Sequence, residues 1–517
     1  MSHAQMYERV LASDASCNGR FFTGVLTTGI YCLPSCRARK PKAENIRFFP
    51  SCQAAREAGL RACKKCHPDD FEHGADPVLE TVEALVAEVR AEPRKFPDAR
   101  AIVRRSGFGA TRVFELFRLH YHTTPADLLA GARVAAARRM LLGAADGGTS
   151  GGGGRRQKTG RAMPLPDVAA AAGFESQSAF HAHFRRLNGL TPSACRELGA
   201  DDDATAARGF TVTLPAGYPL ALLWRTLGRD PLGVTENLKG GVFRAAIRIG
   251  ADGAPALLTM RFEDGGRVRA TCSRGPAHEA HAVVARVLGL SQDTAAFARL
   301  ARRRGFARLV KGREGLRLVQ TVSAFDGLAW AIIGQQINLP FAFQLRQRLA
   351  LHAGEPAGDG LVALPAPATV AALSPETLCA LKFSRQKADY LINAARLIVS
   401  GRLDLEGLRE LSATRAERVL AAVRGLGPWS VNYLMMRSLG FADCVPYGDT
   451  GLTGGLQLLM KLEQRPGADA TRRLMSVFSP HRSLATAHLW QMKSNFPGAI
   501  PSSTTSAPQN TIGKTNE

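Results

Sequence analysis

The sequence has no hydrophobic run that approaches the roughly 20 apolar residues needed to cross a bilayer. Its first residues, MSHAQMYER, lack the basic start and the apolar stretch of a secretory signal. We therefore expect a cytoplasmic protein with no membrane partner. Because thiols stay reduced in that compartment, the ten cysteines favour a metal site or catalysis over a disulfide framework.

Acidic residues are also scarce. The chain has 44 Asp and Glu against 67 Lys and Arg, a net charge of +23, shared as +10 over residues 1–200 and +13 over residues 201–517. Cationic proteins bind nucleic acid by displacing counterions from its phosphates. An arginine-rich coding bias is the simple alternative. The charge in both halves predicts that each half contacts a polyanion separately.

Four of the cysteines form two close pairs. Residues 27–36, TTGIYCLPSC, contain Cys32 and Cys36, and residues 61–66, RACKKC, contain Cys63 and Cys66. A C-x3-C pair followed after 26 residues by a C-x2-C pair is typical of a tetrahedral four-thiolate zinc site. The spacing predicts one Zn²⁺ held by all four cysteines and, taken alone, indicates only a structural zinc domain.

The residues around these cysteines add a function. The stretch FFTGVLTTGIYCLPSCRAR, with ENIRFF and AGLRACKKCHPD downstream, resembles the first domain of the Ada family of bacterial methylation-response proteins. The resemblance implies that Cys32 takes a methyl group from a methylphosphotriester in DNA, since zinc keeps its sulfur as the reactive thiolate. It also implies that the phosphate is held by Thr28, Arg37, Arg39 and Arg61. A purely structural zinc site is the alternative.

A helix-turn-helix pattern occurs twice. In residues 167–192, DVAAAAGFESQSAFHAHFRRLNGLTP, a short helix ends at Gly173 and a second begins near Ser176. The pattern recurs 67 residues upstream, although His122 stands where a glycine is expected at the turn. The pair resembles the AraC-type DNA-binding domain that follows the zinc domain in the Ada family. The candidates for base contacts are Ser176, Gln177, Ser178 and Arg185.

The segment 423–437, VRGLGPWSVNYLMMR, has the signature of a helix-hairpin-helix motif. Gly425 and Gly427 let the hairpin backbone approach a DNA phosphate. Asp449, in VPYGDTGL, follows Gly427 by 22 residues. Together with AIIGQQIN at 331–338, these features resemble AlkA-type 3-methyladenine DNA glycosylases of the helix-hairpin-helix superfamily, over about 210–497. Such enzymes flip a damaged nucleotide out of the duplex and cut its glycosidic bond.

The resemblance assigns roles to single residues. Asp449 would stabilise the oxocarbenium-like sugar and help activate water, although a helix N-cap is the alternative. Trp429 stands where strand-cleaving members have a nucleophilic lysine, so we predict a monofunctional glycosylase. Trp429 and Tyr433 would form a π-rich pocket for cationic bases, unless they only pack in the core. His481 stands where AlkA has a pocket tryptophan, and Gln336 where it has a gap-filling leucine.

The expected fold class is multidomain. We expect a small α/β zinc domain at 1–78, an all-α helix-turn-helix domain at 79–200 with a Gly-rich insertion at 143–161, an α+β lobe of the AlkA type at 208–315, an all-α helix-hairpin-helix domain at 316–497 and a disordered tail at 498–517. The P-C-H-R motif of an O6-methylguanine transferase domain is absent.

These expectations describe a DNA alkylation-repair and adaptive-response protein. It would excise 3-methyladenine and other alkylated bases, and accept methyl groups on Cys32 to regulate transcription. Its partners would be double-stranded DNA and, for activation, RNA polymerase, and we expect a monomer. One alternative is a transcriptional regulator with a non-catalytic glycosylase-like domain. Another is a repair enzyme whose front domains only localise it.

Overall fold

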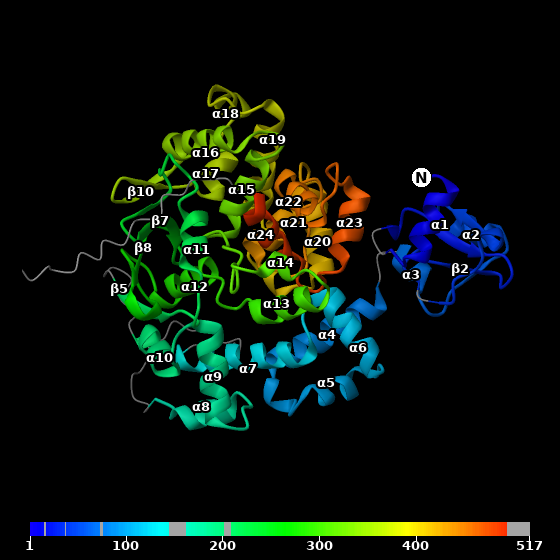
Figure 1. Cartoon of the computed structure of the whole chain (residues 1–517), viewed down its shortest axis with the longest axis horizontal. Coiled ribbons are helices and arrows are strands. Elements are labelled where there is room, and N and C mark those ends of the chain that lie inside the picture. The colour runs from blue at the N-terminus through cyan, green and yellow to red at the C-terminus, as the bar shows by residue number, and fades with distance from the viewer. Residues whose placement is uncertain (15–16, 37, 73–75, 144–161, 201–207, 494–517) are drawn as a thin grey trace, which may run out of the picture. The chain divides into compact units, whose positions relative to one another are not determined.

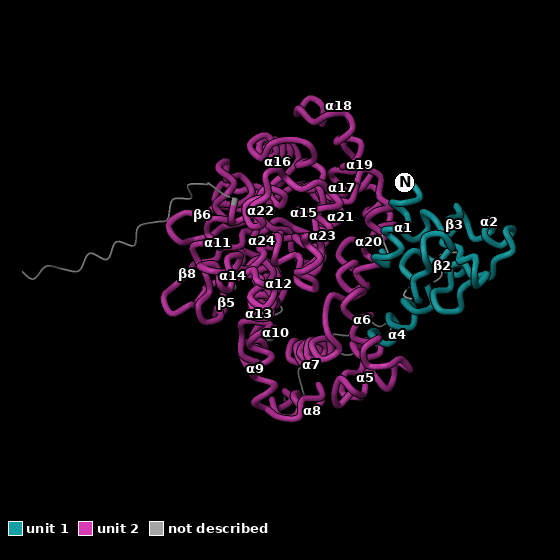
Figure 2. Tube along the Cα trace, turned by 45° about the vertical axis from the view of Figure 1, so that its right-hand side comes forward, with its two compact units in different colours: residues 1–87 teal, residues 88–517 magenta. Residues whose placement is uncertain are grey.

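The computed structural model describes residues 1–14, 17–36, 38–72, 76–143, 162–200 and 208–493. The expected tail, and the expected linker beyond residue 143, lie outside the described residues. The chain forms two compact units, residues 1–87 and 88–517, which divide within helix α4 (Pro77–Ala91) (Figure 2). Among the described residues, no helix has both the length and the apolar character needed to cross a membrane.

The first unit is a small sheet with short helices. Its strands are β1 (Phe22–Val25), β2 (Ile30–Cys32), β3 (Ile46–Phe49) and β4 (Arg61–Ala62), in the order β3-β1-β2-β4, and its helices are α1 (His3–Leu11), α2 (Cys52–Glu57) and α3 (Pro68–Glu72). Strands β2 and β4 are parallel, with Ile30 opposite Arg61. Cys32 ends β2 and Cys63 directly follows β4, so this pairing brings the two cysteine pairs together.

The second unit begins with helices that occupy the two segments where helix-turn-helix pairs are expected (Figure 1). They are α5 (Ala99–Ser106) with α6 (Ala110–Tyr121), and α8 (Leu165–Ala171) with α9 (Gln177–Asn188), joined by the long α7 (Pro125–Leu141) and followed by α10 (Pro192–Ala200). Phe117, Phe180 and Phe184 are fully buried. The opposite face of α9 is mainly polar, whereas α6 also exposes Phe114 and Leu119.

A five-stranded antiparallel sheet follows. Its strands are β5 (Arg208–Thr213), β6 (Glu236–Lys239), β7 (Val242–Ile249), β8 (Ala254–Glu263) and β9 (Arg267–Cys272), in the order β5-β9-β8-β7-β6, with helices α11 (Leu220–Leu227) and α12 (Ala277–Val287). Side chains along β9 alternate between exposed and buried, as in a sheet with one face covered. Val284 and Val287 of α12 pack in the same core as this sheet.

The remaining chain is largely helical. Its helices are α13 (Thr294–Arg303), α14 (Ala307–Val310), α15 (Ala324–Ile333), α16 (Leu339–Ala353), α17 (Pro367–Ala372), α18 (Pro375–Ala380), α19 (Arg385–Val399), α20 (Ala413–Ala421), α21 (Pro428–Leu434), the π-helix η6 (Met435–Leu439), α22 (Thr450–Met460), α23 (Ala468–Ser476) and α24 (Arg482–Lys493). The helix α15 is buried along nearly its whole length, at the centre of the largest core.

The prediction that this last region is entirely helical is wrong at one place. A hairpin of β10 (Glu355–Gly358) and β11 (Leu361–Ala363) interrupts it. The two strands pair only with each other, and the β10–β11 hairpin contacts the preceding region, because Val362 N–H donates to the Val234 carbonyl at 2.9 Å and Glu355 forms an ion pair with Arg248 at 2.7 Å.

Candidate functional sites

The four predicted cysteines meet at one point. The sulfurs of Cys32, Cys36, Cys63 and Cys66 all lie within 4.8 Å of one another, and all but Cys66 are buried. The main-chain N–H of Leu33 donates to the Cys66 sulfur at 3.3 Å, which stabilises negative charge there. Four soft sulfur donors at this separation fit one ion about 2.3 Å from each, the geometry of a closed tetrahedral zinc site.

The predicted phosphate-binding residues are placed in part. Thr28, Arg39 and Arg61 are exposed, while Arg37 lies outside the described residues. Arg61 N–H donates to the Gly29 carbonyl at 2.8 Å, so Arg61 lies beside the turn that contains Thr28. Two of the four predicted residues thus share one edge of the sheet that presents Cys32, and their contact with phosphate stays a prediction.

The second helix-turn-helix presents its candidate residues to solvent. Ser176 caps α9, with its hydroxyl accepting from Ala179 N–H at 3.2 Å. Ser176, Gln177, Ser178 and Arg185 are all exposed. The polar face of α9 is therefore free of the protein core, as base contacts would require, and those contacts stay a prediction.

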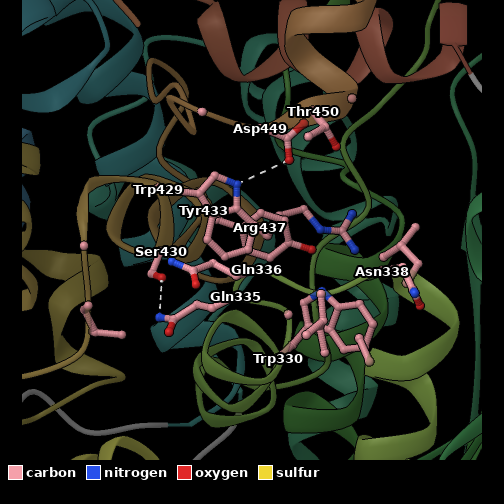
Figure 3. Close-up of a pocket in the computed structure, with 18 of the residues that line it drawn as sticks. Trp330, Gln335, Gln336, Asn338, Trp429, Ser430, Tyr433, Arg437, Asp449 and Thr450 are labelled. Carbon is pink, nitrogen blue, oxygen red and sulfur yellow. Dashed lines mark hydrogen bonds between the residues drawn. The ribbon is translucent and has the colours of Figure 1, made fainter. Parts of the chain in front are cut away.

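A cavity of about 2300 Å³ gathers most of the predicted residues of the helical region (Figure 3). Its lining includes Gln336, Gly425, Gly427, Trp429, Tyr433 and Asp449. Sites for one small molecule have volumes of roughly 300–1,000 Å³. The cavity is therefore a groove with room for a stretch of polymer, and the aromatic side chains and the carboxylate lie within it.

Asp449 is held by three donors. Its Oδ1 accepts from Leu452 N–H at 2.7 Å and from the Trp490 indole at 2.9 Å. Its Oδ2 accepts from the Trp429 indole at 3.3 Å, the bond drawn in Figure 3. The first of these bonds makes Asp449 the N-cap of α22, so the alternative role given for it above, a helix N-cap, is also present. A helix cap does not require the two additional hydrogen bonds from the indoles. These bonds fix the orientation of the carboxylate inside the cavity.

The aromatic part of the cavity differs from the prediction in one member. Trp429 stacks on Tyr433 with centroids 5.1 Å apart and 24° between planes, and Tyr433 lies 6.2 Å from Trp490. The prediction that His481 lines this pocket is wrong. His481 packs against Phe297 outside the cavity lining, and burial lowers its pKa. Trp490, in α24, is the aromatic residue that reaches the carboxylate.

Changing Trp490 to Phe keeps a ring in place and removes the indole N–H that orients Asp449. We expect base release at saturating DNA to fall about tenfold, the cost of one hydrogen bond to a charged group. His481→Ala is the matched control, and it should leave that rate unchanged. Equal losses in the two variants would contradict the placement of these side chains.

Two arginines beside Tyr433, the buried Arg437 and the partly buried Arg229, were not predicted. Although burial raises the pKa of the Tyr433 hydroxyl, Arg437 and Arg229 outweigh it and hold that pKa below its usual value. Arg437 also donates to the Val319 carbonyl, and the Arg229 guanidinium lies 5.6 Å from the Trp330 ring centroid. The cavity therefore combines two guanidinium groups with the Asp449 carboxylate and the aromatic stack.

The turn of the helix-hairpin-helix motif, around Gly425, is fixed to the segment that contains Gln336. Gly425 has a φ of +97°, and a side chain there would begin 2.2 Å from the Tyr390 ring. Gln335 Nε2 donates to the Gly425 carbonyl at 2.8 Å and to the Ser430 hydroxyl at 2.9 Å. The neighbouring Gln336 is exposed, with a φ of +54°. Hydrogen bonds of Gln335 thus link the helix-hairpin-helix turn to the segment that carries the proposed gap-filling residue.

Comparisons with known proteins agree with this geometry. The family described as the metal binding domain of Ada matches residues 5–69, and the HhH-GPD superfamily of base excision DNA repair proteins matches residues 329–480. A probable bifunctional transcriptional activator/DNA repair enzyme AlkA of Mycobacterium tuberculosis is 29% identical over 515 residues, covering 94% of this chain and 95% of that protein.

Two further relatives match single parts. The DNA-3-methyladenine glycosylase of Bacillus subtilis is 33% identical over 181 residues, which cover 34% of this chain and 60% of that protein. The regulatory protein ada of Salmonella typhimurium is 52% identical over 62 residues, which cover 12% of this chain and 18% of that protein. The chain therefore combines an Ada-type metal-binding domain with a domain of the HhH-GPD superfamily of base excision DNA repair proteins.

Proposed function

We propose that this protein removes alkylated bases from double-stranded DNA and, on its zinc domain, accepts methyl groups from DNA methylphosphotriesters. The observation that carries the first activity is the Asp449 carboxylate, which Trp429 and Trp490 fix inside a groove beside the hairpin. A domain kept only for binding DNA would have no use for an anion oriented in this way. The alternative of a non-catalytic glycosylase-like domain is therefore disfavoured.

The excision step follows from these side chains. Hairpin amides around Gly425 and Gly427 bind a phosphate of the damaged strand, and the flipped nucleotide enters the groove. As the bond between base and sugar lengthens, positive charge develops on the sugar ring. Asp449 stabilises that charge and accepts a proton from the attacking water. The base leaves with the bonding electrons, and an abasic site remains.

Methyl transfer at the zinc domain is a separate reaction. A bound zinc ion keeps the sulfurs deprotonated at neutral pH. The Cys32 sulfur attacks the methyl carbon of a phosphotriester, the bond from that carbon to oxygen breaks, and an ordinary phosphodiester anion leaves. Thr28, Arg37, Arg39 and Arg61 are proposed to hold the phosphate. Cys32 ends as a thioether, and the change in charge at the site would alter the attraction of this domain to DNA.

We also propose how the chain divides into domains. Residues 79–200 are proposed to be an AraC-type DNA-binding domain, supported by the two helix pairs and by the exposed face of α9. Residues 208–315 would be the first lobe of the glycosylase, and residues 316–497 its helix-hairpin-helix domain. A methylated Cys32 would then direct promoter binding by a cytoplasmic monomer that recruits RNA polymerase.

We expect base release without strand cleavage. The hairpin position used for a Schiff base holds Trp429, and the lysine that lies buried in the groove lining, Lys387, donates to the Ile333 carbonyl at 2.6 Å. Borohydride added during turnover of methylated duplex DNA should therefore trap no covalent complex. A trapped complex would contradict the proposal, and its loss in Lys387→Met would identify the amine responsible.

A further inference from the structure

The first helix-turn-helix ends in an unusual residue. His122 follows α6 with a φ of +54°, a left-handed conformation that costs a non-glycine residue about 1 kcal/mol or more. The corresponding residue after α9 is Gly189, with a φ of +65°. Contacts of the His122 side chain can offset this cost.

Those contacts lie in the glycosylase domain. His122 Nδ1 accepts a hydrogen bond from the main-chain N–H of Asp443 at 3.1 Å, and its ring meets the Phe441 ring edge-on at 5.8 Å. Burial lowers the pKa of His122 to about 4. The imidazole is therefore neutral near pH 7, with its proton on Nε2 and the Nδ1 lone pair available to the amide.

The Asp443 amide is one of three consecutive amides that side chains hold. Cys444 N–H donates to the Ser483 hydroxyl at 3.1 Å, and Val445 N–H donates to Asn432 Oδ1 at 3.1 Å. The glycosylase domain supplies both of these acceptors. The first amide of the three is held from outside that domain, by the helix-turn-helix.

The segment fixed in this way leads directly to the catalytic carboxylate. Asn432 lies on α21, which carries Trp429, and Ser483 lies on α24, which carries Trp490. Asp449 comes four residues after Val445, and its two indole donors come from these same helices. The hydrogen bonds donated by these three main-chain amides therefore set the position of Asp449 relative to the tryptophans that orient it.

The side chain of Asp443 makes this segment stiff. Arg482 binds its carboxylate through Nε and Nη2, each at 2.8 Å, and the Ser479 hydroxyl donates to it at 2.8 Å. Burial opposes ionisation, but Arg482 outweighs it and holds the pKa of Asp443 below its usual value. A displacement at the Asp443 amide would therefore be passed along the segment instead of being absorbed locally.

We propose that His122 is a positioning residue for base excision, which fixes the segment carrying Asp449 from the helix-turn-helix domain. The inference rests on the proposed glycosylase activity of Asp449. It makes the AraC-type domain a working part of the catalytic centre. DNA that binds α6 and shifts its last turn would change the rate of excision.

Other contacts keep the domains together without His122. His120 Nδ1 lies 2.8 Å from the Thr414 hydroxyl, and Arg90 forms an ion pair with Glu410 at 3.2 Å. At the second helix-turn-helix, Thr213 N–H donates to the Gly189 carbonyl at 2.8 Å. Loss of the His122 ring alone should therefore leave the domains docked.

The test uses the full chain and duplex DNA treated with a methylating agent. His122→Gly removes the acceptor and suits the left-handed backbone, so folding should be kept. We expect the rate of base release at saturating DNA to fall about tenfold with KM and the thermal midpoint unchanged. His122→Asn should restore the wild-type rate, because asparagine tolerates this backbone and places Oδ1 where Nδ1 lies. Arg90→Ala, which removes a domain contact remote from Asp443, should not alter the rate.

Each result is decisive. Wild-type rates in both His122 variants, or equal losses in both, would overturn the proposal, because the acceptor at this position would then not matter. A loss in Arg90→Ala as large as in His122→Gly would also overturn it, since docking in general would be responsible. No base release by the wild-type chain would instead refute the proposed function on which the inference rests.

Discussion

Asp449→Asn is expected to lower the rate of base release from methylated duplex DNA by about a hundredfold to a thousandfold, the range seen when one oriented electrostatic group is removed from an active site. Asparagine keeps the shape of the side chain and is a good N-cap, so α22 should remain folded. Its Oδ1 can still accept from Leu452 N–H and the Trp490 indole. What it lacks is the negative charge that faces the developing cation, and the Oδ2 that accepts from the Trp429 indole.

A matched control separates this effect from any loss of a helix or loop cap. Asp404 is exposed, and its carboxylate accepts from the Gly407 main-chain N–H at 2.9 Å. It does not line the groove. Asp404→Asn should therefore release base at the wild-type rate. A wild-type rate in Asp449→Asn, measured as free base per enzyme in a single turnover, would show that the carboxylate is not part of the chemistry.

Cys63→Ala is expected to abolish zinc binding and unfold the first unit. The apolar core around Phe22, Tyr31 and Phe49 is small, and small domains gain little from burial alone. Structural zinc supplies an apparent 10–16 kcal/mol at about pH 7, as much as the whole usual stability of a domain, about 5–15 kcal/mol. Zinc content by mass spectrometry and amide exchange across β1 and β2 measure the two effects.

The control for this variant is a thiol outside the cluster. Cys379 lies in α18 of the second unit, and Cys379→Ser should keep one zinc per chain and full exchange protection in the first unit. Cys32→Ser removes the methyl acceptor as well as a zinc ligand, so DNA carrying methylphosphotriesters should add the mass of one methyl group to the wild-type chain and none to this variant. Full zinc content in Cys63→Ala would contradict the four-sulfur site.

The motifs that could be predicted from the sequence are those that keep their chemistry in a few contiguous residues. The C-x3-C and C-x2-C pairs predict a metal site because a tetrahedral ion demands that spacing. Gly425 and Gly427 mark a hairpin because they permit a close backbone approach. Asp449 could be placed from its distance to that hairpin, and the structure brings all of these hairpin residues into one groove.

The residues that were missed act through tertiary contacts. Trp490 lies nine residues beyond His481, and only the packing of α24 decides which of the two meets the carboxylate. Arg229 comes from the preceding lobe and reaches Tyr433 across the domain boundary. In the sequence, His122 is only a departure from the glycine expected at the turn. Its side chain accepts a hydrogen bond from the main-chain N–H of Asp443, more than three hundred residues away, and the sequence pattern does not reveal this contact.

The most direct test of the account is to incubate the full chain with duplex DNA methylated at adenine N3 and to identify the products by mass. We expect free 3-methyladenine and an unbroken strand that contains an abasic site. DNA that is bound but yields no free base, or a strand that the protein itself cleaves, would contradict the proposed monofunctional glycosylase.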